Sequence, residues 1–170
     1  MNISDILNSG QKTKAEQLNT GEVFALWEQL VMRYDVYEMT DIFENFANDV
    51  DFRAILTMGK DVLKKEISEL EKKMNTYEIP LPPSPPKSIN TPANTEVLRD
   101  EHMFRLVFMG VQNFLTGHIR GILNSNNENL IDMYIKFEKK ELDIFKKLKK
   151  YGTLKGWQFS TPKYKGNSSN

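Results

Sequence analysis

Apolar residues recur at helical spacing in four long segments of the chain, with polar residues on the opposite side of each pattern. The first segment runs from about residue 20 to 47 and the second from about 50 to 77. The third runs from about 100 to 124 and the fourth from about 127 to 151. Because a spacing of three or four residues places side chains on one face of an α-helix, the pattern predicts four amphipathic helices.

Capping residues mark several ends of these predicted helices. Asn19 followed by Glu22 is typical of a capping box at the start of the first helix. Asp49 or Asp51 is suited to the N-cap of the second helix. Gly152 is expected to end the fourth helix. The short junctions between helices one and two, and between three and four, predict two antiparallel hairpins.

A proline-rich segment, residues 78–97, separates the two hairpins. It contains six prolines, which remove backbone donors and fix φ: Pro80, Pro82, Pro83, Pro85, Pro86 and Pro92. Such a segment is extended and stiff, and it is long enough to run the length of a bundle. Two hairpins joined by one long crossover are typical of an all-α, ferritin-like four-helix bundle.

The predicted domain organisation is simple. Residues 1–18 are expected to form an N-terminal arm, residues 19–165 the four-helix domain, and residues 166–170 a disordered tail. Trp157 and Phe159 are expected to fold back over one end of the bundle. Gly59 in the second helix is expected to allow close helix packing. The three glycines of the third helix are expected to allow close packing or a local bend: Gly110, Gly117 and Gly121.

Composition and charge exclude several classes of protein. The 170-residue chain has no cysteine, so a disulfide framework, a thiolate metal site and a cysteine nucleophile are impossible. The 23 basic and 23 acidic residues balance, which argues against a nucleic-acid partner. No apolar run is long enough to span a bilayer and no secretory signal is present, so we expect no membrane partner and an intracellular protein.

The charges are unevenly distributed along the chain. Residues 22–51 contain eight acids and a single base, Arg33, whereas residues 136–165 contain ten lysines and three acids. The simplest interpretation is two solvated helix faces that attract each other within the bundle. The alternative is charge-complementary association between subunits.

A partial set of metal-ligand residue types lies on or beside the apolar faces. Two-metal bundles use a Glu from each of two helices and a Glu-x-x-His from each of the other two. Here Glu66, His118, Glu138 and Glu141 are the candidates, perhaps joined by Glu38, but neither Glu-x-x-Glu pair ends in His. Three interpretations stay open: a buried structural network, exposure through helix rotation, or a site for iron or manganese. No phosphate-binding loop, nucleophile elbow or His-Glu-x-x-His motif is present.

Four segments carry a resemblance to a known family: GEVFALWEQL, LEKKMNTYEIPLP, LRDEHMFRLVFMGVQNFLTGHIRGIL and FKKLKKYGTLKGWQFSTPKY. Together they resemble the bacterial Coat F-like families, which are spore-coat-associated ferritin-like proteins of endospore-forming Firmicutes. The resemblance covers about residues 19–165, and its most specific motifs are Leu26-Trp27 and Lys155-Gly156-Trp157. It implies a four-helix ferritin-like fold, an association with sporulation and no established enzyme activity.

These observations lead to one expectation and two alternatives. We expect a non-enzymatic structural component of the spore coat or of sporulation. It would need no cofactor, form a homodimer, contact other coat proteins, and be located in the cytoplasm or the spore coat. One alternative is a di-metal (Fe/Mn) oxidoreductase or metal-storage protein that uses Glu66, His118, Glu138 and Glu141 as ligands. The other is a helical bundle that binds an apolar ligand between its hairpins.

Overall fold

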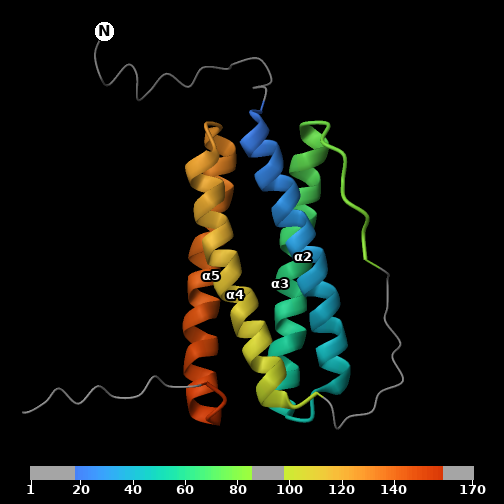
Figure 1. The fold of residues 1–170 in the computed structure, drawn as a ribbon, viewed down its shortest axis with the longest axis vertical. Helices are drawn as coiled ribbons and strands as arrows, with labels where there is room; N and C mark the ends of the chain where they lie inside the picture. Colours follow the sequence, from blue (N-terminus) through green and yellow to red (C-terminus); the bar gives the residue numbers. More distant parts are fainter. Residues whose placement is uncertain (1–17, 86–97, 159–170) are drawn as a thin grey trace, which may run out of the picture.

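The computed structural model describes residues 18–85 and 98–158. Within these ranges the chain forms four α-helices and no strand: α2 (Thr20–Phe46), α3 (Val50–Thr76), α4 (Asp100–Asn124) and α5 (Glu128–Lys155). The four helices lie side by side as a bundle (Figure 1). The predicted all-α four-helix bundle is therefore confirmed.

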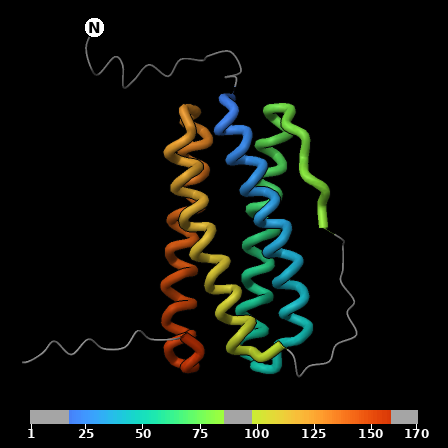
Figure 2. The backbone as a smooth tube through the Cα atoms, viewed as in Figure 1, coloured from blue at the N-terminus to red at the C-terminus, as the bar shows by residue number. Residues whose placement is uncertain are grey.

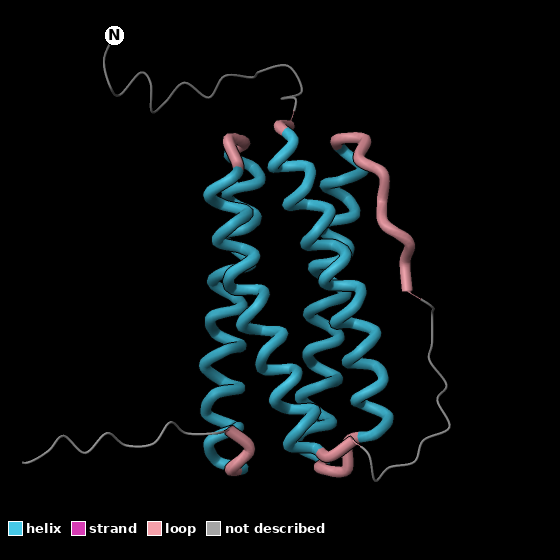
Figure 3. Tube along the Cα trace, viewed as in Figure 1, coloured by secondary structure: helices cyan, strands magenta, loops and turns pink. Residues whose placement is uncertain are grey.

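The connections between helices agree with two hairpins and one long crossover. Short turns join α2 to α3 and α4 to α5, and α4 also packs against α2. The end of α3 and the start of α4 lie at opposite ends of the bundle (Figure 2). From the end of α3, residues 77–85 run as a loop along the outside of the bundle (Figure 3). Most of the remaining crossover, the N-terminal arm and the tail at 166–170 lie outside the described residues.

Three of the helix starts are capped by side chains that accept backbone N–H groups. Asn19 Oδ1 accepts from Glu22 N at 2.9 Å and Glu22 Oε2 accepts from Asn19 N at 2.7 Å, which is the predicted capping box. Asp49 caps α3 through Phe52 N at 2.9 Å, and Asn127 caps α5.

The predicted end of α5 at Gly152 is wrong. The helix continues to Lys155 and ends at Gly156, whose left-handed φ of 69° suits a glycine at this position. Gly152 is instead buried inside the helix, where the ring of Phe104 occupies the space that a side chain would need. The glycine is required for close contact between α4 and α5, not for helix termination.

The end of α3 uses a non-glycine residue in the left-handed conformation. Glu78 has a φ of 54°, Glu78 N donates to Asn75 O at 3.2 Å, and Ile79 N donates to Met74 O at 2.9 Å. This is a Schellman motif, and its apolar contact is made by Ile79 and Met74, which belong to one core cluster.

Replacing Glu78 with glycine is expected to stabilise the protein. A left-handed conformation costs a residue with a Cβ about 1–2 kcal/mol, a cost that glycine avoids, although glycine loses more entropy on folding. We expect Glu78→Gly to raise the free energy of unfolding by about 0.5–1 kcal/mol in urea titrations. Glu78→Ala, which keeps the strained φ, serves as the control and should not stabilise. A loss of stability in Glu78→Gly would contradict this account of the cap.

The core consists of two clusters along the bundle, separated by a central polar layer. One cluster, near the start of α2, includes Leu26, Leu30, Leu70 and Tyr134. The other, near the start of α4, is rich in aromatic residues, and Trp157 packs against it. The ring of Trp157 lies 5.6 Å from Phe52 and 5.7 Å from Tyr151 between centroids. Trp157 thus covers this end of the bundle as expected, whereas Phe159 lies outside the described residues.

The two glycines in the second half of α4 allow close approach, as expected. Gly117 leaves room for the side chain of Gln29 on α2, and Gly121 for the ring of Tyr134 on α5. The expectation of close packing is wrong for Gly59, and Gly110 makes no close contact either, because a Cβ at either position would meet nothing within 4 Å.

An acidic side chain at each end of the bundle links one hairpin to the turn of the other. Glu22 Oε1 accepts from Asn126 N at 2.7 Å and from Asn127 N at 2.8 Å, in the α4–α5 turn. At the opposite end, Asp100 accepts from Asn48 N at 3.0 Å and from Asp49 N at 2.7 Å, in the α2–α3 turn. Carboxylates therefore satisfy turn amides and fix the two hairpins against each other at both ends.

Candidate functional site

A buried arginine lies at the centre of the bundle and connects three helices. Arg33 on α2 has no exposed surface. Its Nε donates to Glu66 Oε2 on α3 at 3.1 Å, and one terminal nitrogen donates to Gln29 Oε1 at 2.6 Å. The other terminal nitrogen lies 2.9 Å from His118 Nε2 on α4. A buried cation needs such partners, because leaving it unpaired would cost several kcal/mol.

Aromatic rings enclose the same guanidinium group. Its central carbon lies 4.7 Å from the ring centroid of Phe114 and 4.9 Å from that of Phe137. The ring of His118 stacks on Phe114 at 6.2 Å. The planar guanidinium thus gains cation–π contacts in a site from which water is excluded.

His118 is a neutral imidazole with a defined tautomer. Burial, and then the positive charge of Arg33, lower its pKa to about 3. Because the guanidinium can only donate, Nε2 of His118 is the acceptor and the proton is on Nδ1. Nδ1–H then donates to Glu138 Oε2 on α5 at 3.3 Å. His118 therefore links Arg33 on α2 to Glu138 on α5.

The carboxyl groups of Glu66 and Glu141 differ in their partners. Glu66 accepts from Arg33 at one oxygen and from Lys140 Nζ at the other, at 3.0 Å. Glu141 is 4 % exposed, and no hydrogen bond joins its carboxyl group to the described residues. Burial, and then the negative charge of Glu66, raise the pKa of Glu141 to about 8. Glu141 is consequently neutral near pH 7.

The raised pKa of Glu141 predicts a pH dependence of stability. The folded state holds this proton up to about pH 8, whereas the unfolded state releases it near its ordinary pKa of 4.5. This contribution to stability is thus complete below pH 4.5 and is lost as the pH rises toward 8. His118 acts in the opposite sense, because its lowered pKa costs stability as the pH falls below 6.5.

Glu141→Gln is expected to remove the pH dependence of stability that is due to Glu141. Relative to wild type, the variant should gain about 2–3 kcal/mol of unfolding free energy between pH 5.5 and 7.5. Urea titrations of both proteins across this range give the difference, in which the contribution of His118 cancels. Parallel pH profiles for the two proteins would show that Glu141 is ionised in the folded state.

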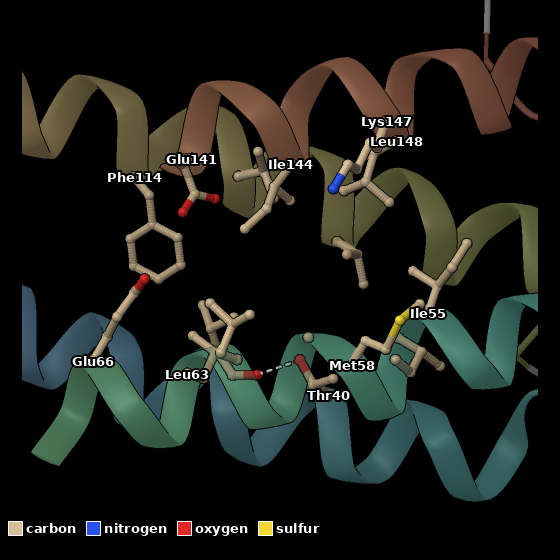
Figure 4. Close-up of a pocket in the computed structure, with 16 residues that line it drawn as sticks. Thr40, Ile55, Met58, Leu63, Glu66, Phe114, Glu141, Ile144, Lys147 and Leu148 are labelled. Carbon is tan, nitrogen blue, oxygen red and sulfur yellow. Dashed lines mark hydrogen bonds between the residues drawn. The ribbon is translucent and has the colours of Figure 1, made fainter. Parts of the chain in front are cut away.

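An apolar cavity of about 330 Å³ adjoins the network on the side of Glu66 and Glu141. All four helices line it, and its wall is mostly aliphatic (Figure 4). Glu66, Glu141 and Phe114 lie at one end, and the amino group of Lys147 points into the space from α5. Gly59, which the sequence placed at a close helix contact, lines this cavity instead.

Comparison with known proteins assigns the chain to a family. The family model described as a protein of unknown function, DUF3231, matches residues 7–169. The chain belongs to the DUF3231 family. The model that matches is not that of the Coat F-like families, so membership of those families stays a prediction.

This DUF3231 protein also resembles a solved structure. A crystal structure from Bacillus halodurans, described as that of a "putative spore coat protein", superposes with a TM-score of 0.81 at 23 % sequence identity. The match covers 89 % of the present chain and 98 % of the other. At this identity the likeness shows the shared fold. No curated protein matches the chain. None of the described helices is long and apolar enough to cross a membrane.

In this DUF3231 protein, the residues named from sequence are brought together around a residue that sequence analysis did not select. Glu66, His118 and Glu138 belong to one hydrogen-bonded network with Arg33, and Glu141 lies beside it at the cavity. Arg33 follows Leu26 and Leu30 at helical spacing, which places it on the apolar face of the helix. This position is the feature of the sequence that could have identified Arg33 as a buried residue.

The arrangement of these residues does not suit a metal ion. The described ranges contain no group of three or more His, Asp or Glu residues that could hold one. The lone pairs that would bind a metal, on Glu66 Oε2 and His118 Nε2, accept from Arg33 instead. The geometry therefore favours the structural-network interpretation of the four candidates in this DUF3231 protein, and the metal site stays a prediction without a supporting contact.

Proposed function

We propose that this protein is a non-enzymatic structural component of the spore coat, with a ferritin-like bundle as its scaffold. The observation that supports this most is that the central polar groups bind one another. The guanidinium of Arg33 binds Glu66 and His118, the groups that ferritin-like enzymes would direct at a metal. The chemistry available at the centre is therefore that of a structural network.

The same groups are poorly placed for catalysis on a diffusing substrate. His118 is fully buried and Glu66 is 3 % exposed. General acid–base catalysis requires a group within hydrogen-bond reach of the substrate at a pKa near the working pH. His118, with its pKa near 3 and both nitrogens engaged, does not meet this requirement.

The assignment to the coat is supported by the spore-coat description of the structural relative and by the resemblance of the sequence to coat-associated families. Its test is the location of the protein in sporulating cells. A fluorescent fusion expressed in a spore-forming Bacillus should gather around the developing spore, and the untagged protein should be recovered with the detergent-extracted coat fraction. Uniform fluorescence in the mother cell, with no protein in the coat extract, would contradict the proposal.

A coat component must associate with other molecules, and we propose a homodimer as the first step. Phe24 and Trp27 on α2 are 59 % and 43 % exposed, which is unusual for large apolar side chains so close together. Light scattering after size-exclusion chromatography should give twice the mass of one chain, and Phe24→Glu should reduce it to the monomer mass. A monomeric wild-type protein at micromolar concentration would exclude the dimer.

A further inference from the structure

A row of lysines on α5 faces α3: of Lys136, Lys140, Lys147 and Lys155, only Lys147 has no acidic partner among the described residues. Lys136 pairs with Glu69 at 2.7 Å and Lys140 pairs with Glu66 at 3.0 Å. Lys147 lies seven residues beyond Lys140, which returns it to the same helix face. Within the described residues it forms no ion pair or hydrogen bond. Lys147, which is exposed to solvent, thus lines the cavity without an acidic partner.

Apart from Glu66 at one end, the part of α3 that lines the cavity is apolar. Its lining residues there are Ile55, Leu56, Met58, Gly59, Val62 and Leu63. The opposite wall is formed by Val107, Val111 and Phe114 of α4 and by Ile144 and Leu148 of α5. Such a wall favours an alkyl chain over water or a polar molecule.

The far end of the cavity from Lys147 carries an unpaired polar group. Glu141 is 4 % exposed, and its carboxyl group has no hydrogen-bond partner among the described residues and points into the space (Figure 4). A buried carboxyl group without a partner is costly unless it is neutral. The inner end therefore carries a neutral carboxyl group beside the ion-paired carboxylate of Glu66, while the exposed Lys147 supplies a positive charge without an acidic partner.

We propose that this cavity binds a medium-chain fatty acid, with its carboxylate paired to Lys147 and its alkyl chain in the apolar interior. At about 1.5 Å rise per residue, the wall from Ile55 to Glu66 is about 16 Å long, which is long enough to hold an extended chain of about ten carbons. The cavity volume of about 330 Å³ lies in the range of small-molecule sites. This ligand site goes beyond the structural role in the coat and does not depend on it.

The first experiment fills the cavity with a larger side chain at a lining position that has free space around it. A Cβ at Gly59 meets no atom within 4 Å, and Gly59 lines the cavity, so Gly59→Leu should fold and occupy the site. Gly110 on α4 has equally free space but does not line the cavity, which makes Gly110→Leu the matched control. Both changes also raise helix propensity.

Decanoate is the probe, measured by isothermal titration calorimetry below its micellar concentration. We expect one binding site per chain in wild type and in Gly110→Leu, and at least about tenfold weaker binding in Gly59→Leu. Absence of decanoate binding to wild type would overturn the proposal. Equal binding to Gly59→Leu and Gly110→Leu would overturn it as well, because the fatty acid would then bind elsewhere.

The second experiment tests whether Lys147 binds the carboxylate of the ligand. Wild type should prefer decanoate to decanol, and Lys147→Ala should lose that preference while it keeps its affinity for decanol. Lys146→Ala, a neighbouring lysine that does not line the cavity, is the control. A preference for decanoate that survives in Lys147→Ala would show that Lys147 does not bind the carboxylate.

Discussion

Replacing Arg33 with methionine is expected to lower the free energy of unfolding by about 3–5 kcal/mol. The variant would leave the carboxylate of Glu66 without its buried cation and the Nε2 atom of His118 without a donor. Methionine retains much of the packing volume between Phe114 and Phe137, so the loss reports mainly on the broken polar contacts. Urea titration followed by circular dichroism measures the effect.

Two further variants distinguish the loss of the buried network from the loss of one positive charge. Arg120→Met removes an arginine that pairs with Glu28 on the surface, where such pairs contribute less than about 1 kcal/mol. Arg33→Met combined with Glu66→Met replaces the buried ion pair by apolar side chains and should recover much of the lost stability. If Arg33→Met and Arg120→Met cost the same, Arg33 is not the centre of the structure.

Replacing Glu22 with alanine is expected to cost about 3 kcal/mol. Its carboxylate, which is 2 % exposed, accepts from the backbone amides of Asn19, Asn126 and Asn127. The variant would leave the amides of Asn126 and Asn127, in the α4–α5 turn, without this acceptor. It would thereby loosen the contact between the two hairpins.

Glu28→Ala, one and a half turns further along the same helix, is the control for Glu22→Ala. Its exposed pair with Arg120 should contribute less than about 1 kcal/mol. Hydrogen exchange of the amides of Asn126 and Asn127 gives a local readout, and their protection should fall only in Glu22→Ala. Unchanged protection would show that another group satisfies these amides.

Sequence periodicity was sufficient to predict the four helices, and the short junctions between them were sufficient to predict their pairing. The capping residues Asn19, Asp49 and Asn127 act locally, so their pattern is visible in a few consecutive residues. Gly152 was misinterpreted because a glycine near a helix end resembles a terminator. Its actual reason, contact with the ring of Phe104, depends on a residue 48 positions away.

The central site was predicted only in part, because some of its contacts join residues that are far apart in the sequence. Glu66 and His118 were recognisable as polar residues on apolar faces, since helical spacing determines the face. Their partner was missed because Arg33 was counted with the surface charges of an acidic segment, although it continues the apolar line of Leu26 and Leu30. Which buried polar groups meet depends on the rotation and spacing of packed helices, and these are properties of the tertiary structure.

The central claim is that Arg33, and not a metal ion, balances the buried carboxylate of Glu66. Its most direct test is the metal content of protein purified without chelator and then incubated with excess iron or manganese, measured by mass spectrometry after desalting. We expect far less than one ion per chain, and the same result for Glu66→Gln. Near-stoichiometric iron or manganese in wild type that is lost in Glu66→Gln would contradict the claim, and two such ions per chain would establish the two-metal alternative.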